Sequence, residues 1–131
     1  MARATDIPNG VSALAPSAGA LYKICSRQSW SEALERGALP SSRDDLRDGY
    51  VHLSAAHQVR GSLDKHFAGQ SELLLLVIPS AGLPPHALRW EPSRGGELFP
   101  HLYAELRCEL VREVIELPLG ADGRQLLPQD F

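Results

Sequence analysis

The chain has 131 residues, of which 44% are hydrophobic and 22% are charged, and its formal net charge at pH 7 is −3. This length predicts one domain with its own core, and the acidic balance argues against the basic surface that binds duplex nucleic acid. The longest apolar run, residues 73–78, is too short for a membrane span, which needs about 20 residues.

We expect three parts along the chain: a flexible leader over residues 1–19, one domain over residues 20–118, and a short C-terminal tail over residues 119–131. The leader is rich in small residues and lacks the continuous apolar core of a secretory signal. Cys25 and Cys108 match no zinc or redox spacing, so we expect buried thiols in a cytoplasmic protein.

A strand and a helix open the domain. Residues 21–25 predict a strand, on which Lys23 lies on the face opposite Tyr22. A short helix is predicted to run through Arg36, with Ser26 or Ser29 as its cap and Gly37 as its stop. Its expected buried stripe has three members at helical spacing: Trp30, Ala33 and Leu34.

A second strand and helix follow a polar segment. Residues 43–49 are polar and end in an Asp-Gly turn signal. Residues 50–54 predict a strand on which Tyr50, His52 and Ser54 share one face. Ser54 also suits the N-cap of a helix over residues 55–68, in which the apolar residues recur every four positions.

The rest of the domain predicts mainly strands. The uninterrupted apolar run of residues 73–78 is typical of a central strand that is buried on both faces. Residues 87–90 predict a short strand, and the alternation in residues 109–117 suits a last strand at a sheet edge. Helices early in the chain and strands late in it favour an α+β fold.

Residues 88–103 carry the strongest functional signal. They combine aromatic and ionisable residues with two prolines and the pair Gly95-Gly96, a mixture that suits neither a plain helix nor a plain strand. A segment that gives up regular structure but keeps such side chains is typical of a ligand-binding loop. The alternative is a surface loop that its aromatic side chains pin to the core.

Several polar side chains are candidates for chemistry. His52, beside the Ser54 hydroxyl, could position or activate a substrate group, because histidine titrates near neutrality; a histidine bonded into the core is the alternative. Arg94 beside Gly95-Gly96 suits a phosphate or carboxylate.

Glu91 could orient a sugar hydroxyl or act as a base, with a solvated surface charge as the alternative, and His101 and Tyr103 would share a face of an extended chain. No histidine spacing fits zinc, so we expect no metal.

Three segments, residues 21–25, 46–54 and 88–103, closely resemble a bacterial family of small proteins known as domain of unknown function 952. That family is similar in fold to ADP-ribosyltransferases and RNA 2′-phosphotransferases. The similarity implies a small curved or split α+β sheet of mixed strand direction, with two helices packed on it and NAD in the cleft.

The resemblance also implies roles for individual residues. His52 and Glu91 would be the catalytic pair, and the remaining ligand-binding residues would be Lys23, Ser54, Arg94, Gly95, Gly96, His101 and Tyr103. We therefore expect an NAD- or nucleotide-binding enzyme like the ADP-ribosyltransferases, or a degenerate relative of them. The alternatives are a non-catalytic module that binds a phosphorylated metabolite and a domain that docks a partner protein.

Overall fold

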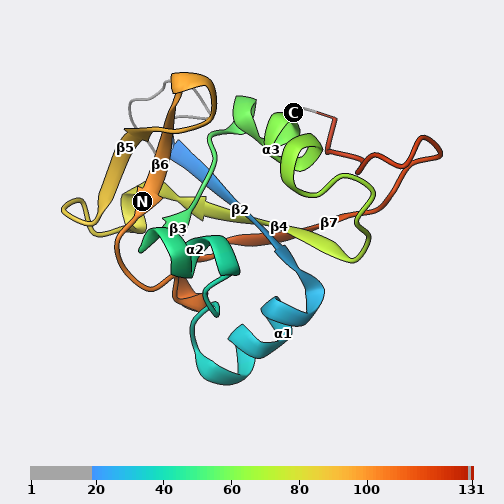
Figure 1. Ribbon diagram of the computed structural model, residues 1–131. Coiled ribbons are helices and arrows are strands. Elements are labelled where there is room, and N and C mark those ends of the chain that lie inside the picture. The colour runs from blue at the N-terminus through green and yellow to red at the C-terminus, as the bar shows by residue number, and fades with distance from the viewer. Residues whose placement is uncertain (1–18, 130) are drawn as a thin grey trace.

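The computed structural model describes residues 19–129 and residue 131, without the side chain of Arg94. It has an α+β fold with two three-stranded antiparallel sheets, as Figure 1 shows. The expectation of mixed strand directions was wrong, because every strand pair among the described residues is antiparallel. The expected leader, apart from Gly19, lies outside the described residues.

The first sheet has the order β2 (Ala20–Ser26), β4 (Leu73–Pro79) and β7 (Glu113–Leu117). The apolar run is the central strand, as predicted, and both its faces are buried. Leu74, Leu76 and Ile78 enter one hydrophobic cluster, while Leu73 and Leu75 enter the other. One strand thus supplies two cores, because its side chains alternate between the faces. The predicted edge strand is β7.

The second sheet has the order β3 (Val51–His52), β6 (Leu98–Leu102) and β5 (Leu88–Pro92). The expected irregular loop is therefore wrong: β5 and β6 form a hairpin around a 3₁₀ turn at Arg94–Gly96. Pro100 lies in the middle strand although it has no N–H to donate. Its carbonyl accepts from the Leu53 N–H, 3.1 Å away, just past the end of β3. The N–H and C=O of one strand residue point the same way, so the missing donor would also face the chain beyond β3, where the short strand has ended.

The two sheets meet at a single bridge between Tyr22 of β2 and Ser54. Two backbone hydrogen bonds, each 2.8 Å long, join these residues. Beyond this bridge the sheets diverge, and α2 (Arg43–Asp48) and α3 (Val59–His66) lie on opposite sides of β2 in Figure 1.

The first helix, α1 (Arg27–Arg36), ends as predicted at Gly37, which is in the left-handed conformation, and of the two candidate serines Ser26 is the N-cap. Its predicted stripe was wrong at Leu34, which is 63% exposed, whereas Ala33 is fully buried. A ten-residue helix at the molecular edge buries only a narrow face.

The second helix, α2, was missed, because its six residues are mostly charged and offer no apolar period. Its stability comes from a capping box: the Ser42 hydroxyl accepts from the Asp45 N–H, and the Asp45 carboxylate accepts from the Ser42 N–H. The expected polar turn is therefore a helix that ends at Gly49.

The third helix begins later than predicted. A 3₁₀ turn at Ala56–Gln58 precedes it, and the Gln58 side chain accepts from the Ala55 N–H at 2.9 Å. Ser54 is therefore not the N-cap. The helix ends at His66, and the segment after β7 packs on that end through Gln125, which donates to the carbonyls of Phe67 and Gln70. No helix in the described part of the chain is long and apolar enough to cross a membrane.

We expect Leu75→Ala to lower the free energy of unfolding by about 2–5 kcal/mol, because Leu75 is fully buried on the central strand. Leu34→Ala is the matched control and should change it by less than about 0.5 kcal/mol, because Leu34 faces solvent. Urea denaturation followed by circular dichroism measures both. Equal losses in the two variants would contradict this assignment of the core.

Candidate functional site

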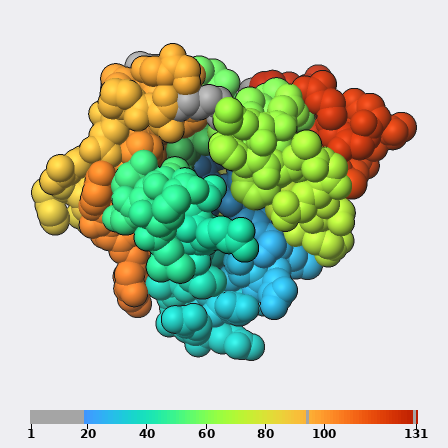
Figure 2. Space-filling view, viewed as in Figure 1, coloured from blue at the N-terminus to red at the C-terminus, as the bar shows by residue number. Residues whose placement is uncertain are grey.

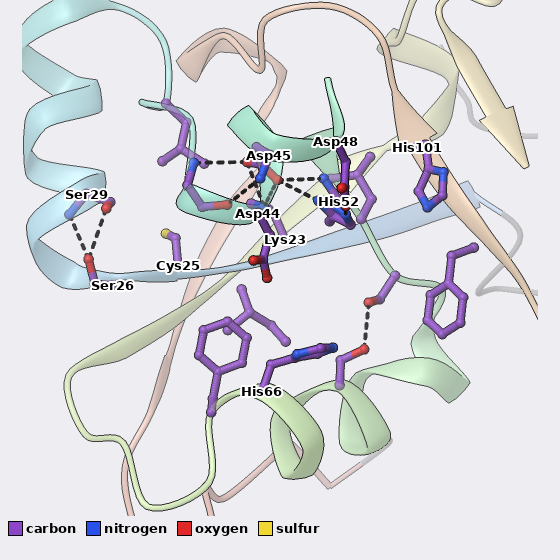
Figure 3. Close-up of a pocket in the computed structure, with 18 of the residues that line it drawn as sticks. Lys23, Cys25, Ser26, Ser29, Asp44, Asp45, Asp48, His52, His66 and His101 are labelled. Carbon is purple, nitrogen blue, oxygen red and sulfur yellow. Dashed lines mark hydrogen bonds and ion pairs between the residues drawn. The ribbon is translucent and has the colours of Figure 1, made fainter. Parts of the chain in front are cut away.

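A pocket of about 370 Å³ lies between α2 and α3, with β2 along its floor. Figure 2 shows the hollow in the middle of this face of the molecule, and Figure 3 shows the side chains around it. Its walls come from β2, α2, β3, α3 and β6, so residues far apart in sequence meet there.

Four of the predicted site residues line this pocket: Lys23, His52, Ser54 and His101. Glu91, Gly95, Gly96 and Tyr103 do not line it. The Arg94 side chain lies outside what the structure describes. Gly95 and Gly96 are exposed at the tip of the hairpin, with φ of 68° and 82°, and their backbone conformation makes the turn.

The floor of the pocket holds a buried ion pair. The Lys23 ammonium lies 3.3 and 3.2 Å from the two Asp45 carboxylate oxygens. Only 6% of Lys23 and 4% of Asp45 is exposed. This contact joins β2 to α2. It also pairs the Lys23 charge with a carboxylate, which a buried charge needs because burial without a partner is costly.

The Asp45 carboxylate also accepts from His52, through the backbone N–H at 3.1 Å and through Nδ1 at 2.7 Å. Burial alone would favour the neutral acid, but the hydrogen bonds from His52 and the attraction of Lys23 outweigh it and hold the pKa of Asp45 well below its usual value. An ionised Asp45 is thus the common acceptor for β2, α2 and β3.

His52 lies between two carboxylates. Its Nε2 is 2.9 Å from Asp48, on the opposite side of the ring from Asp45. Arg47 and His52 lower the pKa of Asp48 to about 2, the hydrogen bond from Arg47 contributing most. Each ring nitrogen thus faces a carboxylate oxygen that can accept from it. This arrangement fixes the ring at the pocket wall.

The opposite wall is supplied by α3. The buried hydroxyls of Ser54 and Ser62 are 3.3 Å apart, and His66 lies further along the same wall. Sequence reasoning missed Asp45, Asp48, Ser62 and His66. The sequence did carry a signal for Asp45. Ser42 and Asp45 have the spacing of a capping box, which predicts a helix start and places the later Asp48 near His52.

A second polar cluster lies on the hairpin. The Glu91 carboxylate is 2.8 Å from His101 Nδ1 and accepts from the Tyr103 hydroxyl at 2.8 Å. The hydrogen bond from His101, followed in size by that from Tyr103, holds the pKa of Glu91 below its usual value. The bond between Tyr103 and Glu91 in turn raises the pKa of Tyr103.

The two clusters share one face of the second sheet. His52 pairs directly with His101, and His101 pairs with Arg89, two positions before Glu91. Tyr50 stacks on the His101 ring with the centroids 3.9 Å apart. The imidazole of His52 and the carboxylate of Glu91 therefore lie on the same side of the sheet, although only His52 lines the pocket.

The remaining candidates for chemistry are less favourable. Cys25 lines the pocket, but burial raises the pKa of its thiol to about 11, against the opposing attraction of Lys23, so it is a poor nucleophile at neutral pH. Cys25 and Cys108 are both free thiols, and Cys108 is only partly buried. The described residues contain no cluster of histidine, cysteine or acidic side chains placed to hold a metal ion.

A family model described as protein of unknown function DUF952 matches residues 24–114, which include the end of β2, both helices beside the pocket and the hairpin. The chain belongs to the DUF952 family. This confirms the family resemblance read from the sequence; the finer similarity to ADP-ribosyltransferases rests on the resemblance alone.

Solved structures similar to this DUF952 protein include the crystal structure of protein CC0527 from Caulobacter crescentus, which is 42% identical, with a TM-score of 0.78 over 82% of this chain and 94% of that chain. The solution NMR structure of the same Caulobacter protein is 41% identical, with a TM-score of 0.76 over 86% and 96% of the two chains. No curated protein matches the chain.

Replacing Asp45 should strongly destabilise the DUF952 fold. We expect Asp45→Asn to lower the free energy of unfolding by about 3–5 kcal/mol, because it leaves the Lys23 charge buried without a partner. Asp44→Asn is the control: it removes a surface partner of Arg47 and should cost less than about 1 kcal/mol. Urea denaturation at neutral pH measures both, and a loss below about 1 kcal/mol in Asp45→Asn would contradict the importance of the pair.

The same carboxylates predict that the stability of the protein falls in acid. The pKa values of Asp45 and Asp48 are lower in the folded chain than the value of about 3.9 in an unfolded chain. Below about pH 4 the unfolded chain therefore binds more protons, so the stabilisation present above that pH is lost as the pH falls towards about 2, where Asp48 itself titrates. Urea midpoints measured across this range should fall, and less steeply in Asp48→Asn. Parallel profiles would contradict the role of Asp48.

Proposed function

We propose that this DUF952 protein binds the nucleoside part of a nucleotide in the pocket between α2 and α3, as an enzyme like the ADP-ribosyltransferases or a degenerate relative. NAD is the first candidate ligand. The observation that carries this proposal is that Lys23, His52, Ser54 and His101, from both sheets, line one cavity. The size of that cavity, about 370 Å³, is within the range of small-molecule sites.

The charges around the pocket favour the uncharged part of such a ligand. Three carboxylates line it, those of Asp44, Asp45 and Asp48, against the cations of Lys23 and Arg47. Each of these cations is already paired with a carboxylate. The lining therefore suits hydroxyl and amide groups, which can exchange hydrogen bonds with histidines and serines, better than it suits a pyrophosphate.

An acidic lining also suits the chemistry of glycosidic bond cleavage. When the bond between nicotinamide and ribose breaks, positive charge develops on the ribose, and fixed carboxylates nearby stabilise it. In this account the field comes from the excess of three carboxylates over two cations in the lining, and His52, held between Asp45 and Asp48, faces the ligand. This account assigns the electrostatic role to residues other than Glu91, which does not line the pocket.

The test is calorimetry with NAD at up to about 1 mM, combined with chromatographic detection of released nicotinamide. We expect measurable binding, and we expect His52→Gln to weaken it about tenfold by losing hydrogen bonds at the pocket wall. His86→Gln is the control, because His86 is exposed and does not line the pocket.

The outcomes separate the candidate functions. Binding with release of nicotinamide supports the enzyme, and binding without release supports a non-catalytic module in the same pocket. If NAD gives no heat of binding and no nicotinamide is released, NAD is not the ligand of this pocket. Equal affinity in His52→Gln and His86→Gln would place the binding site elsewhere on the molecule.

A further inference from the structure

The side chain of His101 has an unusual position for a histidine. It is 1% exposed and lines the pocket, and Figure 3 shows its ring extending from β6 on the side where His52 lies. Its Nε2 is buried and has no hydrogen-bond partner among the described residues. It is the only buried side-chain nitrogen or oxygen in the described part of the chain that lacks a partner. Buried polar atoms without partners are rare in folded proteins because they cost free energy, and those that occur call for an explanation.

The other ring nitrogen determines which form of the ring is present. Nδ1 lies 2.8 Å from the Glu91 carboxylate, which already accepts from the Tyr103 hydroxyl. An ionised carboxylate can only accept, so Nδ1 carries the hydrogen and donates it. In the neutral ring Nε2 is then a bare acceptor, because each neutral imidazole has one donor and one acceptor.

Two further contacts hold the ring in place. Tyr50 stacks on its face with the planes 21° apart, and His52 meets it edge-on with the centroids 5.6 Å apart. The direction of the Nε2 lone pair is thus fixed before any ligand arrives, which is the condition for a selective polar contact.

We infer that His101 is the residue that selects the ligand of the proposed pocket, by accepting at Nε2 a hydrogen bond from a ligand hydroxyl, and that Glu91 is the positioning residue that fixes this tautomer. The inference rests on the proposed function, under which the hydroxyl belongs to a ribose. A site built around a bare acceptor rejects analogues that lack the donor, because the acceptor is then left buried and unpaired.

The test compares nicotinamide riboside with its 2′-deoxy and 3′-deoxy forms by calorimetry on the full chain. We expect one of the two deoxynucleosides to bind about 10- to 100-fold more weakly than the parent nucleoside. His101→Asn should abolish this discrimination: its amide nitrogen takes the place of Nδ1 and can still donate to Glu91, but nothing remains at the position of Nε2.

A second pair of variants separates the positioning role from a structural one. Glu91→Met removes the acceptor of Nδ1, frees the ring to change tautomer, and should reduce the discrimination. Tyr103→Phe removes the other hydrogen bond of the same carboxylate oxygen and should leave the discrimination unchanged. Urea denaturation of each variant identifies any that fails to fold.

A measurement without ligand decides the tautomer directly. The nitrogen chemical shifts of His101, in protein labelled with ¹⁵N-histidine, should show a hydrogen on Nδ1 and none on Nε2. A hydrogen on Nε2 would overturn the inference. So would equal affinity for the three nucleosides, or unchanged discrimination in His101→Asn. If no nucleoside binds, the proposed function fails in this form, and the nitrogen shifts alone decide whether the selective acceptor exists.

Discussion

The buried carboxylate of Asp45 is the contact on which the arrangement of the pocket depends. It accepts from Lys23 on β2, from His52 on β3 and from the start of its own helix, so three elements are held by one group. The cost of burying these charges is met only while all of them are paired. The network therefore holds the two sheets in place around the pocket, because moving any of the three elements would leave a buried charge without a partner.

The two sheets divide the structural work. The central strand β4 supplies apolar side chains to two hydrophobic clusters, one on each face of the first sheet. The second sheet is smaller and carries the polar residues of the hairpin, with β3 only two residues long. Past the Tyr22–Ser54 bridge the backbones of the two sheets no longer pair, and polar side chains connect the sheets instead. Pockets in α+β folds commonly form at such places, because the scaffold stays rigid while the lining is free to vary.

The chemistry of the lining changes the expected mode of binding. The Gly-Gly pair that suggested a phosphate grip lies at an exposed turn, and the cations of the pocket are paired with carboxylates. A ligand would therefore be recognised through hydrogen bonds to the histidines and serines of the lining, His101 and Ser54 among them. The outer face of the hairpin leaves Trp90 and Leu98 about half exposed, whereas Phe99 is buried against the pocket. That face is the place where a partner protein would dock if the domain has one.

The sequence by itself determined the elements whose signal is local. The apolar run at residues 73–78 favoured a buried central strand, and a serine cap and Gly37 bounded α1, because solvent exclusion and capping act over a few residues. It also singled out His52, Ser54 and His101, which line the pocket. The tertiary structure alone decided the rest. A six-residue charged helix and a hairpin interrupted by prolines carry no periodic signal, and Asp45 reads as a surface charge until Lys23, 22 positions away, is brought against it. Pairing between distant residues is set by the packing of the whole chain, which no local pattern records.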